Sequence, residues 1–422
     1  MKCIIPVLLA LLTPIGAWAQ SDENGPEALV AEAYGANPSL RAMEHREQAL
    51  RERARVAGAW PDPMLAVEYS NAPVTTFGLS DHPMSGLQLK LTQMLRPPGW
   101  SRASRDVLDF KSEASAQVVA EAGLGLSLMV RSAWWLLVRT RLLRQVTESH
   151  LARTEELLAV ARIRYEVGAV GQHAVLRLKV QRGHLADELG DFDRLDMELT
   201  AALTGALAAE AGRAFQTPPT IKAIAPPNQT DWLAVAEAHR PVLARYRAEE
   251  ASAEQAARAA RLEGLPDPSV WAGYRVRTIQ TDLDPGTDMV SVGIGVPIPT
   301  GSGRRAHGAR GAALEEAGAA GFMVEHTLDA IAADMAAIEA RWSRAWEKAG
   351  TYDATLIPAA RATLVTTQSD FAVGRADFAS LFEAEVALLD LERTQIVAAV
   401  ETHIQRAEAT AVLGTTPPGG SL

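Results

Sequence analysis

The chain is one unit written twice, and this repeat limits the folds open to it more than any other feature. Two motifs recur in both halves: Pro61-Asp62-Pro63 with Pro266-Asp267-Pro268, and Tyr165-Glu166-Val167-Gly168 with Phe371-Ala372-Val373-Gly374. The offset stays at about 205 residues, which is far longer than the repeat of a solenoid, so we interpret the chain as two homologous halves. The boundaries of the expected segments are 20–215 for the first repeat, 216–230 for a linker, 231–414 for the second repeat and 415–422 for a C-terminal tail.

Each half predicts the same order of elements. A first helix is followed by a β-hairpin region, a very long helix, a glycine-containing turn and a last helix. In the first half the expected ranges are 28–59, 64–95, 102–165 and 174–204. In the second half they are 231–263, 269–298, 304–370 and 379–412.

The long helices carry a heptad pattern. In the second half, apolar residues alternate at spacings of three and four, which predicts a left-handed coiled coil. This seam comprises Leu328, Ile331, Met335, Ile338, Trp342, Ala345, Ala349 and Tyr352. A rougher seam in the first half comprises Leu136, Leu143, Val146, His150, Leu157 and Val160. Pro358 should break the second long helix, because proline lacks the amide hydrogen that a helix interior needs.

The hairpin regions alternate apolar and polar residues, as a transmembrane β-strand does. A half-buried strand of a soluble protein shows the same alternation, so the strands alone leave both readings open. The residues expected to face lipid are Leu89, Leu91, Val292 and Ile294. Aromatic residues that could form an interfacial girdle, or simply pack at strand ends, are Trp60, Tyr69, Trp100, Trp271 and Tyr274.

Four strands cannot close a barrel, and an open sheet edge cannot lie in lipid. The strands must then be pooled between copies, and three copies supply twelve. The expected fold is therefore mainly α with a small β part. It is a trimeric α-helical barrel of long coiled-coil helices, continued by a shared 12-stranded transmembrane β-barrel with four strands per protomer.

Residues 1–19 predict a secretory signal peptide. Lys2 precedes a short apolar stretch, and Ala17-Trp18-Ala19 has the small-residue pattern of a cleavage site. The apolar stretch is too short to span a bilayer. The formal net charge of −10 argues against a nucleic-acid partner.

Candidate chemistry is sparse. None of the nine histidines is paired at the helical spacing of a metal-ligand pair, so no metal site is expected. Gly301-Ser302-Gly303-Arg304 lacks the Lys-Ser/Thr pair of a phosphate loop. With no nucleophile–base pattern either, we expect neither an enzyme nor a cofactor.

Taken together, these residues resemble the TolC family of outer-membrane efflux ducts over about Ala28 to Gly414. The resemblance rests on Asn37-Pro38, the Pro-Asp-Pro motifs and the two Tyr/Phe-x-Val-Gly tips. It implies a homotrimer in outer-membrane lipid, with a helical barrel that projects into the periplasm. It also implies docking onto a periplasmic adaptor and an inner-membrane resistance-nodulation-division pump, through a tip comprising Tyr165, Gly168, Phe371 and Gly374. Among subfamilies the chain looks most like the heavy-metal cation efflux partners.

The tips depart from the family pattern. Relatives often place aspartate six residues after the tip glycine, where this chain has Ala174 and Ser380. Aligning the two tips sets Arg177 opposite Glu383 and Lys179 opposite Glu385. The candidate gate residues are Arg177, Lys179, Asp377, Ser380, Glu383 and Glu385. We hypothesise that Arg177–Glu383 pairs hold the resting tip closed, the alternative being that these charges are unrelated and solvated.

The sequence therefore predicts an outer-membrane channel subunit of a tripartite efflux system. It would be a passive duct for small solutes, including heavy-metal cations. The alternative function is an exported periplasmic coiled-coil scaffold without channel activity.

Overall fold

The computed structural model describes residues 25–71, 74, 85–228, 231–277, 287–298 and 300–416. The expected signal peptide lies outside the described residues, as do the last two linker residues and 417–422 of the tail. The chain divides into two compact units, which are Met1–Pro38, Gly123–Trp232 and Asp334–Leu422 for one, and Ser39–Ala122 and Leu233–Ala333 for the other. Each unit takes elements from both halves of the sequence.

We name the units by their contents. The sheet unit contains α2 (Pro38–Ala57), β1 (Met64–Ser70), β2 (Gly86–Met94), α5 (Trp232–His239), α6 (Pro241–Glu263), β3 (Ser269–Val276) and β4 (Met289–Gly295), with the first parts of α3 (Trp100–Glu166) and α7 (Ser302–Thr351). The tip unit contains α1 (Pro26–Ala36), α4 (Gln172–Ala206), η1 (Tyr352–Leu356), α8 (Ile357–Ala372) and α9 (Phe378–Leu413), with the remainders of α3 and α7.

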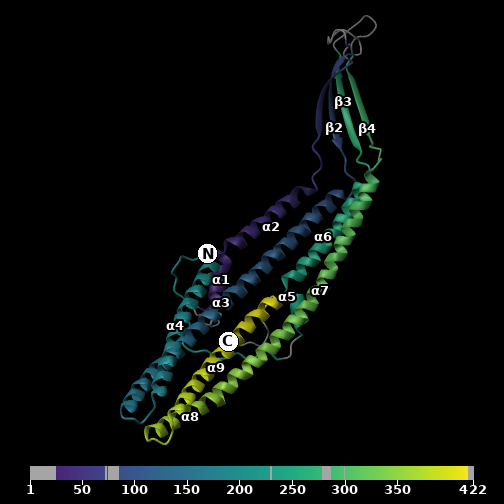
Figure 1. The fold of residues 1–422 in the computed structure, drawn as a ribbon. Coiled ribbons are helices and arrows are strands. Elements are labelled where there is room, and N and C mark those ends of the chain that lie inside the picture. Colours follow the sequence, from purple (N-terminus) through teal and green to yellow (C-terminus); the bar gives the residue numbers. More distant parts are fainter. Residues whose placement is uncertain are drawn as a thin grey trace, which may run out of the picture. The chain divides into compact units, whose positions relative to one another are not determined.

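The four strands form one antiparallel sheet in the order β1-β2-β3-β4 (Figure 1). Both expected hairpins therefore lie side by side. Paired residues in neighbouring strands share a face of the sheet. Leu91 pairs with Leu65 on one side and with Ala272 on the other, and Ala272 pairs with Val292. One face is consequently apolar across all four strands.

The first helix of each half is not continuous, contrary to expectation. The break between α1 and α2 falls at Asn37-Pro38, and the break between α5 and α6 falls at Arg240-Pro241. Proline disfavours the helical conformation of the residue before it, and both Asn37 and Arg240 are extended. The same chemistry interrupts the same element in both halves.

The second long helix also differs from the expectation of a break at Pro358. The chain stays helical, and one π-helical turn, η1, connects α7 to α8. A π-turn holds one extra residue in the helix. It therefore lets the helix continue although Pro358 has no amide hydrogen to donate.

The second heptad seam is confirmed by burial, whereas the first is shifted. Ile331, Met335, Ile338, Trp342, Ala345 and Ala349 are all buried. In α3, by contrast, Val160 is exposed. The buried stripe there includes His150, which lies on the expected seam, and two polar residues that apolar periodicity could not reveal, Thr147 and Thr154. The two hydroxyls donate to the carbonyls four residues earlier, so their burial costs little.

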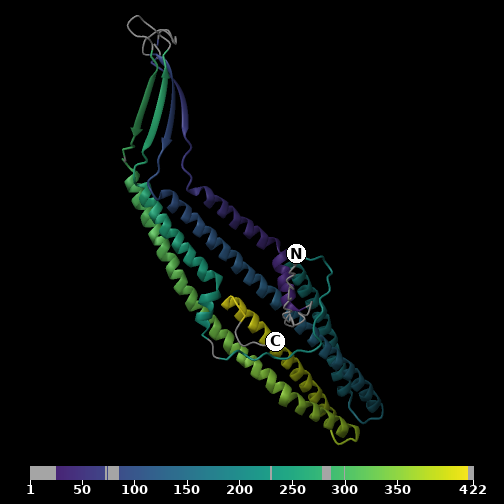
Figure 2. The ribbon, with the colours of Figure 1, turned by 180° about the vertical axis from the view of Figure 1, so that it is seen from behind.

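The tip unit has its core between helices of both halves. One cluster gathers Leu158, Leu178, Leu364 and Leu381, from α3, α4, α8 and α9. Helices α8 and α9 lie side by side in both views (Figure 2). The two helical hairpins of the unit are thus packed together through apolar side chains.

Both long helices end in the same turn. Gly168 and Gly374 have φ values of 72° and 78°. At each tip the glycine amide donates to the carbonyl three residues back, and the next amide donates to the carbonyl five residues back. This is the Schellman arrangement, which requires a left-handed residue after the helix and therefore favours glycine.

Replacing Gly374 with alanine should lower the free energy of unfolding by about 1 kcal/mol, because a Cβ is strained at positive φ. Gly183→Ala is the matched control, since Gly183 lies inside α4 with open space around it. That change should stabilise the protein by about 0.5–1 kcal/mol. Chemical unfolding of the detergent-solubilised protein measures both, and equal effects at the two sites would contradict the turn geometry.

Candidate functional site

The two tips are joined by one arginine. The Arg164 guanidinium, at the end of α3, donates to the carbonyl oxygens of Phe371 and Ala372, both at 2.9 Å. It also lies 4.3 Å from the centroid of the Phe371 ring. These carbonyls end α8, where a cation interacts favourably with the helix dipole. Of the expected docking residues, Phe371 is thus a buried structural anchor, whereas Tyr165 is 45% exposed.

Two candidate gate residues have a local structural role. The Asp377 carboxylate accepts a hydrogen bond of 2.9 Å from the Ser380 amide, and Asp377 is the N-cap of α9. Hydrogen bonds from the Ser380 side chain and amide hold the pKa of Asp377 below its ordinary value. This pair therefore begins the return helix of the second tip.

The expected charge pairs are not formed within the chain. Arg177 lies over the ring of Phe382, 4.2 Å from its centroid, and Glu383 is exposed. Lys179 is exposed too, but Glu385, its expected partner, is 5% exposed and faces the other way, toward α3. The Arg177–Glu383 pairing stays a prediction about contacts with another copy.

A buried charge cluster lies between α3 and α9 in the tip unit. His150 on α3 is 1% exposed, with its Nδ1 2.7 Å from Glu385 Oε1 and its Nε2 3.0 Å from Glu392 Oε2. Arg361 of α8 lies 2.7 Å from Glu392, and Arg153 lies 3.6 Å from Glu385. The cluster therefore ties the first half of the sequence to the second. The available signal was the seven-residue spacing of the two glutamates, which places both on a face of α9 whose other buried residues there are apolar.

The pKa values in this cluster are coupled to its geometry. Burial lowers the pKa of His150, but the contacts with Glu385 and Glu392 outweigh burial and leave it raised. Burial raises the pKa of Glu392, but His150 and Arg361 bring it down to about 2. At mildly acidic pH the imidazole is therefore a cation held between two carboxylates.

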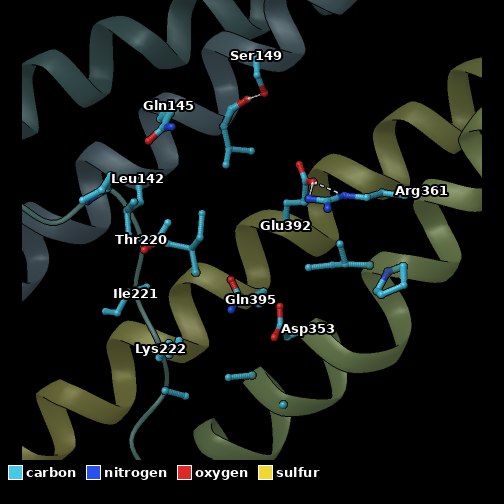
Figure 3. Close-up of a pocket in the computed structure, with 18 of the residues that line it drawn as sticks. Leu142, Gln145, Ser149, Thr220, Ile221, Lys222, Asp353, Arg361, Glu392 and Gln395 are labelled. Carbon is cyan, nitrogen blue, oxygen red and sulfur yellow. Dashed lines mark hydrogen bonds and ion pairs between the residues drawn. The ribbon is translucent and has the colours of Figure 1, made fainter. Parts of the chain in front are cut away.

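The cluster borders a cavity of about 910 Å³ in the tip unit (Figure 3). Residues 219–223 of the linker pass along one side, and α3, α7, η1, α8 and α9 supply the remainder. In Figure 3 Arg361 and Glu392 point toward one another at its wall. The lining mixes both signs of charge, with Lys222 and Asp353 among its polar groups. The Ser149 hydroxyl in this lining donates to the backbone carbonyl of Val146.

The four residues expected to face lipid share the apolar face of the sheet. Leu89 and Leu91 are 43% and 51% exposed, and Val292 and Ile294 are 77% and 74% exposed. Trp271 differs from expectation, because it lies on the opposite face under Lys90, whose Nζ is 4.6 Å from the ring centroid. It is therefore not part of a girdle on the apolar face.

Within the described part of the chain, no helix is long and apolar enough to cross a membrane. The same residues contain no group of three or more His, Cys, Asp or Glu side chains placed to hold a metal ion.

The His150 cluster predicts a pH dependence of stability. Because the folded pKa of His150 is raised, its contribution is complete below 6.5 and is lost as pH rises through the folded value. The Glu392 contribution is present above 4.5 and is lost as pH falls toward about 2. The cluster should therefore stabilise the tip unit most between these limits.

We expect the unfolding temperature of the solubilised protein to fall between about pH 5.5 and pH 8.5, with most of that fall absent in His150→Gln. His184→Gln, at an exposed position of α4, is the control and should keep the full fall. An equal fall in both variants would rule out this role for His150.

Comparison with known proteins agrees with this geometry. Residues 29–187 match the family model described as outer membrane efflux protein. No curated protein sequence matches the chain. Among solved structures, VceC from Vibrio cholerae has 18% identity and a TM-score of 0.76, over 92% of this chain and 96% of its own. CmeC, the outer membrane channel of Campylobacter jejuni, has 13% identity and a TM-score of 0.74, over 98% and 94%. CusC has 14% identity and a TM-score of 0.73, over 93% and 92%.

At these identities the solved structures establish the fold alone. The similarity in sequence to outer membrane efflux proteins comes from the family model. The expected resemblance and the outer-membrane location are confirmed by the match. Residues 29–187 are therefore similar to the outer membrane efflux proteins, and the chain has the fold of these solved outer membrane channels over more than nine-tenths of its length.

Proposed function

We propose that this chain is one third of a trimeric, passive duct that conducts small solutes across the outer membrane. The observation that carries the proposal is the sheet. Its apolar face is exposed over all four strands, and its outermost strands, β1 and β4, have no partner along their outer edges among the described residues.

A single copy of this sheet is unsuited both to water and to lipid. In water it exposes a continuous apolar surface, and in lipid its edges leave backbone amides and carbonyls without hydrogen-bond partners. Three copies joined edge to edge would supply a closed barrel of twelve strands. The polar face, with Lys90, Ser291 and Arg275, would then line the lumen.

We further propose that the tips dock onto a periplasmic adaptor and an inner-membrane resistance-nodulation-division pump. The support is the family relationship together with the exposed Tyr165 and Val167 beside the first tip turn. Heavy-metal cations are the substrates that the subfamily resemblance favours. A duct selects by the charge and width of its lining and requires no metal-binding cluster.

The oligomeric state tests the proposal first. Light scattering of the detergent-extracted protein should give a trimer, and the trimer should form conducting pores in planar bilayers. A monodisperse monomer without conductance would favour the periplasmic scaffold instead.

Val292→Arg should destabilise the membrane-inserted assembly by about 2–4 kcal/mol if Val292 lies near the bilayer midplane. Ser291→Arg is the matched control, because Ser291 is the exposed neighbour on the opposite face. Gly293 is less suitable, since a Cβ there would lie 2.6 Å from the Trp271 ring. Heat-modifiable gel migration measures assembly, and equal defects at both positions would contradict the assigned faces.

Glu383→Arg should raise the resting conductance at low salt, because it places like charges at the proposed contact between copies. Adding Arg177→Glu should restore the closed state. The Arg177→Glu single variant also shows whether loss of the Phe382 contact alone opens the tip. If the double variant conducts as much as Glu383→Arg, the pairing is wrong.

A further inference from the structure

The helix ends nearest the sheet are rich in arginine. In each of four helices we consider the eight residues nearest the strands. These are 50–57 of α2, 100–107 of α3, 256–263 of α6 and 302–309 of α7. They contain nine arginines and three carboxylates, a formal charge of +6 in a chain whose net charge is −10. All nine arginines are exposed: Arg51, Arg53, Arg55, Arg102, Arg105, Arg258, Arg261, Arg304 and Arg305. We call this set the arginine collar.

Three collar residues converge on one hollow. Arg51 and Arg55 of α2 and Arg105 of α3 line a depression of about 330 Å³, together with Ala54 and Asp109. The two helices approach closely beside it, since a Cβ on Gly58 would overlap the Ser101 carbonyl. The close approach brings guanidinium groups from both helices to one place.

The guanidinium groups of the hollow are available to a ligand. Arg55 pairs with Glu52 at 2.8 Å, and both side chains are exposed, so this pair contributes little and exchanges readily. Arg51 is anchored at 2.5 Å to the buried Glu47, and 61% of its side chain remains exposed. Arg105 has no carboxylate within 4.0 Å among the residues that the structure describes. Guanidinium matches the oxygens of a phosphate in a bidentate geometry, so phosphate is the anion that this hollow fits best.

The hollow lies where a membrane surface would be. Trp60, in the connection from α2 to β1, is 54% exposed and lines an apolar depression with Leu95, Pro97 and Leu265. Tryptophan prefers the boundary between lipid and water. If the strands span the bilayer, the collar follows within about 12 Å of helix, which is comparable to the distance over which charges interact in physiological salt.

We propose that the hollow of Arg51, Arg55 and Arg105 binds the headgroup phosphate of an anionic phospholipid in the leaflet that faces the helices. The other collar arginines attract the same leaflet and hold the sheet unit at a fixed depth. The inference rests on the proposed function, because only a membrane-spanning sheet brings the collar to a lipid surface.

Native mass spectrometry can test this on the full chain, extracted from vesicles of phosphatidylethanolamine with a minor fraction of phosphatidylglycerol. The wild type should retain phosphatidylglycerol several-fold over its share of the vesicle. The Arg55→Gln/Arg105→Gln double variant should lose most of this enrichment. Arg194→Gln is the control, because Arg194 is an exposed arginine of α4 that also pairs with a glutamate four residues away. Its enrichment should equal that of the wild type.

A second arm uses the wild type alone, so it does not depend on the folding of a variant. Enrichment should fall steeply as sodium chloride is raised and should persist in millimolar inorganic phosphate. Enrichment that is absent in the wild type or unchanged in the double variant would overturn the proposal. Displacement of the lipid by inorganic phosphate would show a free-anion site instead.

Conductance of the same samples separates the two levels of inference. Pores without phosphatidylglycerol enrichment would count against the lipid site and leave the duct intact. A wild-type protein that forms no pore in any bilayer would count against the proposed function itself.

Discussion

Backbone hydrogen bonding at the edges of a four-stranded sheet is the constraint on which the rest of this molecule depends. The outer edges of β1 and β4 carry amides and carbonyls that need partners, and the exposed apolar face excludes a purely aqueous setting. A single copy cannot satisfy both demands. In the proposed trimer, other copies of the same chain would satisfy them together, because edge pairing would close the sheet and turn the apolar face outward.

In the helices of the tip unit, the two halves of the sequence have diverged and make different contacts. The two tip turns are built alike, yet Arg164 of the first caps the carbonyls that end α8 in the second. His150 likewise meets a carboxylate 242 residues away. The tip-aligned counterpart of His150 is Leu356, and that of Glu385 is Lys179. Only one of the two related helix contacts therefore contains the charge cluster. We expect the stability of that contact to change with pH, and not that of the other.

Much of the fold was predictable because it depends on local patterns. Heptad spacing located the buried face of α7, and alternation located the faces of all four strands. The breaks at Pro38 and Pro241 could have been predicted, because the residue before a proline disfavours the helical conformation. The π-turn before Pro358 was not predictable, since tertiary packing decides whether a helix breaks or bulges there.

The site was harder to predict than the fold, because its contacts join distant segments. Periodicity marked the α3 stripe incorrectly, since the stripe buries Thr147 and Thr154 beside His150. The tip alignment paired Glu385 with Lys179, but burial assigns Glu385 to His150. Opposite charges at equivalent repeat positions indicate a contact only if both side chains remain exposed, which the sequence does not reveal.

Cysteine cross-linking between sheet edges tests the central claim most directly. The only native cysteine, Cys3, can be replaced by serine, and new cysteines placed at Ala66 of β1 and at Ser291 of β4. Within one copy these positions are three strand spacings apart, about 14 Å, which is too far for a disulfide. The account predicts that oxidation gives a ladder of bands ending at a covalent trimer. Monomer bands alone, or a ladder that continues beyond three, would contradict it.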